Sequence, residues 1–132
     1  MTSINASTTS LPHLARVQLR AAAIYLIIGL AMGMWMAAAH TFQFRSVHAH
    51  INLLGWATLA LTGLVYALVP NTATSRWARW HVVLHNLGLP VLLAALTALM
   101  AGHQSIEPLV GLAAGVTTAG LVVFCIGLWR TV

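Results

Sequence analysis

Histidine supplies most of the side chains in this sequence that could do chemistry. His48 and His50 are two residues apart at the start of an apolar run. Residues two apart on an α-helix point about 200° away from each other, because each residue turns the helix by about 100°. The two imidazoles therefore cannot chelate one ion together, and each must serve a neighbour of its own. Neutral imidazole is a good ligand for iron and copper, so each histidine is a candidate ligand on its own side of the helix.

Two other groups of residues have the spacing of metal ligands. His81 and His85 are four residues apart, which places both on one face of a helix and allows them to share an ion. Met32, Met36 and His40 also recur every four residues, and thioethers with imidazole are ligands for Cu(I). Packing is the competing interpretation in both cases: a hydrogen-bonded pair for the histidines, and ordinary core contacts for the methionines.

The composition places these side chains in a membrane protein. The chain has 132 residues, of which 60% are hydrophobic and 5% charged, whereas soluble domains contain about 25% charged residues. The formal net charge of +5 comes from six arginines against one acid, Glu107. The arginines lie at the ends of apolar runs and form no basic block, so the charge does not indicate nucleic-acid binding.

Four apolar runs are each near the ~20 residues that a helix needs to cross the hydrocarbon of a bilayer. They extend over about residues 17–40, 47–69, 80–101 and 109–129. The connecting loops are short, so neighbouring helices run antiparallel. We predict an all-α, integral membrane four-helix bundle formed by one domain, residues 17–132, after an N-terminal tail, residues 1–16.

The arginines also predict the orientation of the bundle. With a cytoplasmic N-terminus, five arginines lie inside and one, Arg45, lies outside, in agreement with the positive-inside rule. We therefore expect an N-in/C-in, multi-pass protein of the bacterial inner membrane. His48 and His50 then lie near the outer side, whereas His81 and His85 lie near the inner side. The two pairs are too far apart for one protomer to hold a single ion with both.

The segment over residues 44–92 resembles the tenth and eleventh helices of the catalytic subunit of haem-copper oxidases, most closely the cbb-type and nitric-oxide-reductase-like branch. That family has a His-x-His pair near the outer end of one helix, then Leu-Gly-Trp, a Gly and a Tyr, a Pro at the inner end, and a Trp-His that opens the next helix. The matching residues here are His48, His50, Leu54, Gly55, Trp56, Gly63, Tyr66, Pro70, Trp80 and His81. The first and fourth predicted helices match only in kind.

The resemblance implies a haem site at the histidine pair. In that family the first histidine binds the high-spin haem iron and the second binds the low-spin haem iron, on opposite sides of one helix. It therefore implies that His48 and His50 are axial ligands of haem b, in a protein of electron transfer or of O₂ or NO binding. His40, Arg45 and Trp56 are further candidates for contact with the haem. For Arg45, a hydrogen bond to a propionate and snorkelling at the interface are both open.

One chain cannot form a complete oxidase, because the family's subunit has twelve helices in three arcs of four and this sequence supplies one arc. Its tyrosines and threonines are scattered and predict no polar line across the membrane. The resemblance therefore implies a homo-oligomer, with a trimer favoured, in which His50 of one protomer approaches His48 or His40 of the next. Gly111 and Gly115 have the small-x-x-x-small spacing of membrane helix contacts, which would serve either between protomers or within one.

Two other functions stay open from the sequence. The Met32, Met36 and His40 stripe, together with His81 and His85, would suit a copper-binding membrane protein. The second alternative is an assembly subunit that binds no cofactor. The sequence identifies no catalytic residue, no physiological substrate and no electron donor.

Overall fold

The computed structural model describes residues 10–132 and is helical over nearly all of that range, with no strand in it. The predicted all-α class is therefore confirmed. In chain order the elements are α1 (His13–Ala38), α2 (Arg45–His50), the π-helix η1 (Ile51–Ala57), α3 (Thr58–Leu68), α4 (Pro70–Thr74), α5 (Arg76–Met100), the 3₁₀ turn η2 (Gln104–Ile106) and α6 (Glu107–Thr131).

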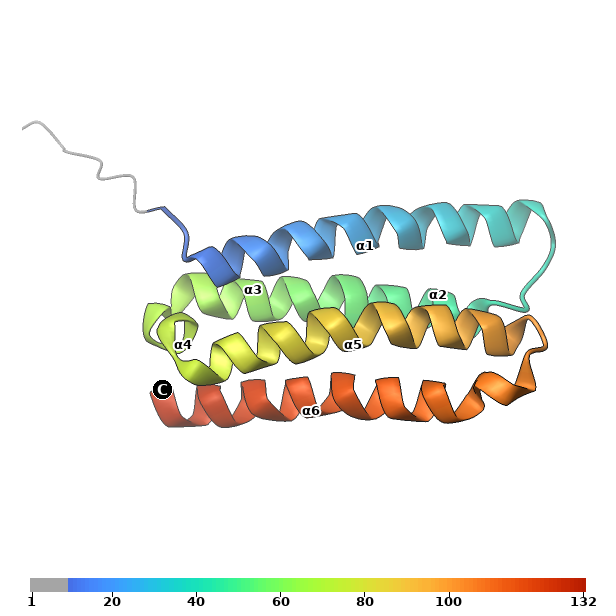
Figure 1. Ribbon diagram of the computed structural model, residues 1–132. Coiled ribbons are helices and arrows are strands. Elements are labelled where there is room, and N and C mark those ends of the chain that lie inside the picture. The colour runs from blue at the N-terminus through green and yellow to red at the C-terminus, as the bar shows by residue number, and fades with distance from the viewer. Residues whose placement is uncertain (1–9) are drawn as a thin grey trace, which may run out of the picture.

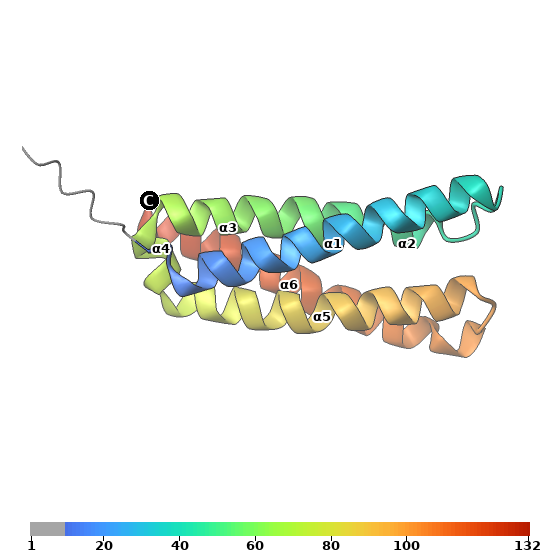
Figure 2. The same cartoon turned by 90° about the horizontal axis from the view of Figure 1, so that it is seen from above.

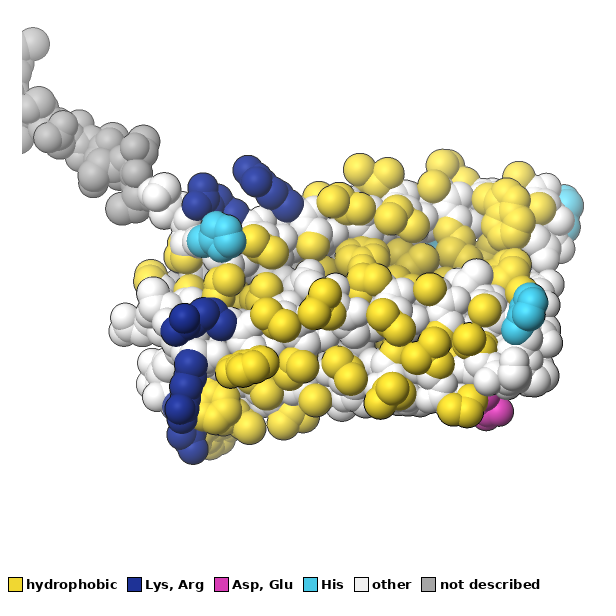
Figure 3. All heavy atoms as spheres, viewed as in Figure 1, with side chains coloured by type: hydrophobic (Ala, Val, Ile, Leu, Met, Phe, Trp, Pro, Cys, Tyr) yellow, Lys and Arg dark blue, Asp and Glu magenta, His cyan; other side chains and the backbone are white. Residues whose placement is uncertain are grey.

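Four helical segments are long and apolar enough to cross a membrane. They are His13–Ala38, Arg45–Leu68, Arg76–Met100 and Gln104–Thr131. Neighbouring segments run antiparallel, and apolar side chains cover the flank of the bundle between its two ends (Figures 1 and 3). The prediction of a multi-pass membrane protein with four spans is confirmed.

Several helix starts differ from the predicted ones. The first helix begins at His13 instead of residue 17, so residues 13–16 of the predicted tail are helical; residues 1–9 lie outside the described part of the chain. Pro70–Thr74, expected as a loop, forms the short helix α4, because proline at the first position has the φ that a helix needs. Ser75 then starts α5 by accepting a hydrogen bond from the backbone N–H of Ala78, at 3.1 Å.

The span Arg45–Leu68 contains an element that the hydropathy pattern did not predict. Its middle part, η1, is a π-helix, in which the backbone N–H of Thr58 bonds to the carbonyl of Leu53, five residues back. The hydroxyl of Thr58 donates to the same carbonyl, at 2.7 Å. Such segments are frequent at functional sites, and this one begins immediately after His50.

The bundle has two chemically different ends. Arginines gather where α1 and α5 begin and α6 ends, and the acidic side chain lies at the other end (Figures 1 and 3). We define the arginine-rich end by Arg16, Arg20, Arg76, Arg79 and Arg130, and the histidine-rich end by His40, His48, His50 and His103. At the arginine-rich end the guanidinium groups of Arg76 and Arg130 lie 5.0 and 5.1 Å from the ring centre of Trp77, within cation–π range.

The spans form two helical hairpins that pack against each other. The first hairpin is α1 with the α2–η1–α3 span, and the second is α5 with α6 (Figures 1 and 2). Glycines allow the closest approach within the first hairpin: a Cβ atom at Gly29 would lie 2.7 Å from Asn52 Oδ1, and one at Gly55 would lie 2.6 Å from Tyr25 Cγ. These contacts fix the face of α2 and η1 that meets α1, and so decide which way the histidines point.

Candidate functional site

One ring nitrogen of His50 makes the hydrogen bond that the second nitrogen of a metal-ligating histidine usually makes. Its Nδ1 lies 2.8 Å from the carbonyl oxygen of Ser46, one turn earlier in α2. A carbonyl only accepts, so Nδ1 carries a proton, and in the neutral ring Nε2 presents a lone pair. A ligating histidine usually donates its second ring N–H to such an acceptor, which fixes both the tautomer and the ring orientation. The side chain is half-buried and so is accessible at the surface of the bundle.

His48 lies against α1. A Cβ atom at Gly33 would stand 3.0 Å from His48 Cε1, so the absence of a side chain at Gly33 makes room for the ring. Asn52 Nδ2 donates to the backbone carbonyl of His48 at 2.8 Å and lies 3.4 Å from both ring nitrogens. The longer contacts exceed the usual hydrogen-bond range, so Asn52 fixes the backbone of His48 more firmly than its ring. Since α2 is α-helical from Arg45 to His50, the geometry that separates the two imidazoles is present.

His40 lies beyond α1, in a backbone conformation that suits glycine. Its φ is +50°, and it is the one non-glycine residue with positive φ in the described chain. It ends α1 in a Schellman motif, in which the backbone N–H groups of His40 and Thr41 donate to the carbonyls of Ala37 and Met36, at 3.3 and 3.1 Å. The strain of an L-residue in this conformation is of the kind that persists at functional sites.

His40→Gly is expected to stabilise the cofactor-free protein by about 1 kcal/mol, the order of the cost of the left-handed conformation for a residue with a Cβ. Gly102 is the matched position, because it has φ +102° at the end of α5 and the same pair of bonds. Gly102→Ala should therefore destabilise the protein. Thermal unfolding of both variants in detergent measures the two shifts, and shifts of equal sign would contradict this account.

The Leu-Gly-Trp segment lies within η1, and its first two residues contact neighbouring helices. The Leu54 carbonyl accepts a hydrogen bond from His85 Nε2, at 3.0 Å, and Gly55 meets Tyr25 of α1. Trp56 is 41% exposed, on the surface of the bundle. Arg45 is the first residue of α2 and is also exposed. Both remain candidates for contact with a bound group.

A buried cluster in the arginine-rich half combines His81 and His85 of α5 with Tyr66 of α3. All three side chains are fully buried. Tyr66 Oη lies 2.7 Å from His81 Nδ1, and the centres of the two histidine rings are 5.6 Å apart. The packing interpretation expected the two histidines to be hydrogen-bonded to each other. Instead, His81 bonds to Tyr66 and His85 bonds to the Leu54 carbonyl. The other ring nitrogens, His81 Nε2 and His85 Nδ1, have no hydrogen-bond partner among the described residues.

A second polar group lies beside this cluster, on three helices. Gln18 of α1 is fully buried, donates to Thr62 Oγ1 at 3.2 Å and accepts from Asn86 Nδ2 at 2.7 Å. The sequence pattern did not predict this connection between Gln18, Thr62 and Asn86. Sequence reasoning missed Gln18, although a glutamine within an apolar span is itself a signal, because a polar group at that depth requires a partner.

Both methionines of the predicted copper stripe have packing contacts. Met36 is buried, and Met32 packs against the cluster of Val47, Ile51 and Leu96. Within residues 10–132 there is no group of three or more His, Cys, Asp or Glu side chains placed to hold a metal ion. The two thioether side chains thus serve packing in this structure. Copper binding by Met32, Met36 and His40 stays a prediction.

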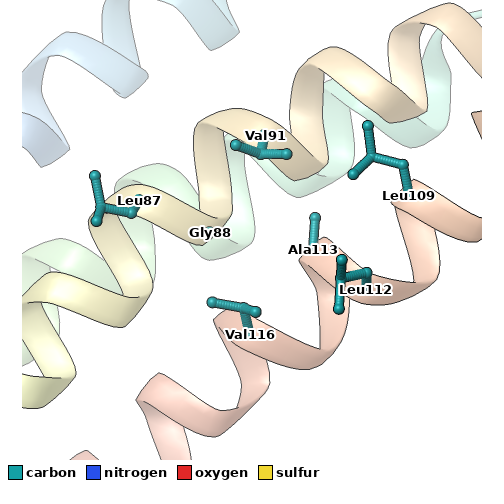
Figure 4. Close-up of a pocket in the computed structure, with 7 residues that line it drawn as sticks. All are labelled: Leu87, Gly88, Val91, Leu109, Leu112, Ala113 and Val116. Carbon is teal, nitrogen blue, oxygen red and sulfur yellow. The ribbon is translucent and has the colours of Figure 1, made fainter.

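The groove between α5 and α6 offers no chemistry. Its volume is about 170 Å³. The side chains that line it are all apolar (Figure 4). The lining residues are Leu87, Gly88, Val91, Leu109, Leu112, Ala113 and Val116.

The candidate site is therefore the histidine-rich end of α2, with the buried Tyr66, His81 and His85 cluster as a second group.

Comparison of the chain with protein-family models, with curated proteins and with solved structures gives no match. The relation to haem-copper oxidases thus rests on the motif residues over 44–92 and stays a prediction.

Proposed function

We propose that this protein binds haem b in the membrane through His50 and His48, as a four-helix relative of the haem-copper oxidase catalytic subunit. The observation that carries the proposal is the state of His50. Its Nδ1–H is engaged by the Ser46 carbonyl, 2.8 Å away, which leaves Nε2 with a free lone pair on a half-buried ring. Bound haem supplies an iron for one-electron transfer or for binding O₂ or NO.

His48 suits the second ligand position for a different reason. Its ring lies on the α1 side of α2, next to the side-chain-free surface of Gly33, and neither ring nitrogen has a hydrogen bond of ordinary length. A rotation of this ring would therefore break no strong bond. His40 is the remaining candidate at the same end, just after α1, and its backbone is strained, with φ +50°.

We propose that protomers associate to complete the coordination, because one chain presents only a few ligands at the histidine-rich end. A homo-oligomer, with a trimer favoured by the threefold arrangement of the related subunit, would bring His50 of one protomer toward His48 or His40 of the next. Gly111 and Gly115 support this association. A Cβ atom at either would meet nothing within 4 Å, so these glycines are not required for packing inside the protomer.

We further propose that the arginine-rich end faces the cytoplasm of a bacterium, with the protein in the inner membrane. Arg16, Arg20, Arg76, Arg79 and Arg130 share that end, and Arg45 alone lies at the other. Such a bias in short loops and tails determines the orientation of membrane proteins.

An absorption spectrum of the protein purified from membranes tests the proposal. We expect a Soret band with sharp reduced α and β bands if both axial positions are filled, and a shift on addition of CO if one is open. A sample that stays colourless after haem is supplied would contradict haem binding. Such a sample would favour copper binding if it carried copper, and an assembly subunit without cofactor if it did not.

A further inference from the structure

We propose that His81 and His85 bind one Cu(I) ion inside the helix bundle. This site is separate from the proposed haem ligands, and it does not depend on them.

The first support is a pair of buried nitrogens without partners. His81 Nε2 and His85 Nδ1 are buried and have no hydrogen-bond partner among the described residues, and both side chains have an exposure of 0%. A buried polar atom without a partner destabilises a fold, and native structures rarely keep one without a reason. Here two such atoms belong to rings one helical turn apart, with centres separated by 5.6 Å.

The second support is the bonding of the opposite nitrogens. His85 Nε2 lies 3.0 Å from the Leu54 carbonyl, an acceptor, so Nε2 holds the proton and Nδ1 holds a lone pair. Tyr66 Oη, 2.7 Å from His81 Nδ1, can also accept a hydrogen bond from the ring N–H. His81 Nε2 then presents a lone pair as well. His85 thus has the outer acceptor that ligating histidines use to fix their tautomer, and Tyr66 supplies such an acceptor to His81 when the ring N–H donates to it.

The separation of the rings agrees with a shared ion. An imidazole nitrogen lies about 2 Å from a bound first-row metal ion, so two rings that share one have their centres roughly 5 to 6.5 Å apart, from tetrahedral to linear coordination. The observed 5.6 Å falls within this interval. The spacing of i and i+4 on α5 presents both rings on one face of the helix.

The charge of the surroundings selects the ion. Glu107 is the one acid in the sequence, and it begins α6 at the histidine-rich end, away from this cluster. No carboxylate is available to neutralise a divalent ion, and an uncompensated double charge inside a bundle in the membrane is costly. Cu(I) has a single charge, binds imidazole and tolerates low coordination numbers, so it fits two neutral nitrogens better than Zn(II) or Cu(II) does.

Titration of the detergent-solubilised full chain with Cu(I), under reducing and anaerobic conditions and against a coloured Cu(I) chelator, tests the site. The wild type should retain one Cu(I) per protomer. His81→Gln and His85→Gln should lose it, while each amide can still bond to Tyr66 or to the Leu54 carbonyl. Tyr66→Phe removes an outer partner only, so it should keep the stoichiometry and weaken the affinity by about 10- to 100-fold.

Two controls separate this site from the other candidates. Met36→Leu should leave copper binding unchanged, and the two glutamine variants should retain any haem spectrum of the wild type. X-ray absorption of copper-loaded wild type needs no variant to fold and should show nitrogen neighbours at about 2 Å without sulfur. Wild type that binds no Cu(I), copper retained by the His81→Gln, His85→Gln double variant, or a sulfur neighbour would each overturn the proposal.

Discussion

His50→Ala should reduce the haem content of the purified protein roughly tenfold or more, because the variant removes an axial bond to iron. The expectation depends on the bond between His50 Nδ1 and the Ser46 carbonyl, which directs the Nε2 lone pair away from α2. The measurement is the ratio of the Soret absorbance to protein concentration. His48→Ala should either lose haem similarly or convert the spectrum to high spin, since its ring lies on the opposite side of α2.

His103→Ala is the matched control for this experiment. His103 lies at the same end of the bundle, is exposed, and its Nδ1 lies 3.2 Å from the Ala98 carbonyl. It thus resembles His50 in the hydrogen bond from Nδ1 to a backbone carbonyl, but it is more exposed and is no part of the motif. Its variant should keep the full haem content. Unchanged pigment in both His48→Ala and His50→Ala would exclude these two histidines as the haem ligands. Loss of pigment in His103→Ala alone would place the haem at His103 instead.

The fold could be predicted from the sequence to the level of four spans, because hydropathy and length decide membrane insertion almost alone. The features that the sequence did not predict depend on contacts between spans. The π-helix η1 follows from no local pattern. It contributes the Leu54 carbonyl that receives the hydrogen bond of His85, 3.0 Å from His85 Nε2. That bond joins residues 31 positions apart in sequence, so no local window contains it.

The two histidine pairs show the same limit. The spacing of His48 and His50 predicts opposite directions on an α-helix, and both residues do lie in the regular α2. The spacing of His81 and His85 predicted a common face, but gave no indication that Tyr66 Oη would lie 2.7 Å from His81 Nδ1. Tyr66 and His81 flank the turn at α4 from opposite sides, so antiparallel packing brings them together. A scan for polar residues on either side of each predicted turn would have found this pair.

Replacement of Gly111 and Gly115 by leucine should dissociate the proposed homo-oligomer without unfolding the protomer. A Cβ atom at either position meets nothing within 4 Å, and leucine has a better helix propensity than glycine. The bundle itself should therefore keep or gain thermal stability. Between protomers, two leucines would separate helices whose contact depends on small residues. The protein mass in detergent, from light scattering, should fall from a multiple of the 14.1 kDa chain to a single chain.

Gly88→Leu is the contrasting variant, because a Cβ atom at Gly88 would lie 2.7 Å from Thr117 Oγ1 and 3.0 Å from the Thr117 backbone nitrogen. That variant should unfold the α5–α6 hairpin, as overpacking of a close contact does. If haem is shared between protomers, the Gly111→Leu, Gly115→Leu variant should also lose its six-coordinate spectrum while the monomer stays folded. An oligomer of unchanged mass would show that α6 faces lipid at these glycines, and a folded monomer with an unchanged haem spectrum would place both axial ligands within one chain.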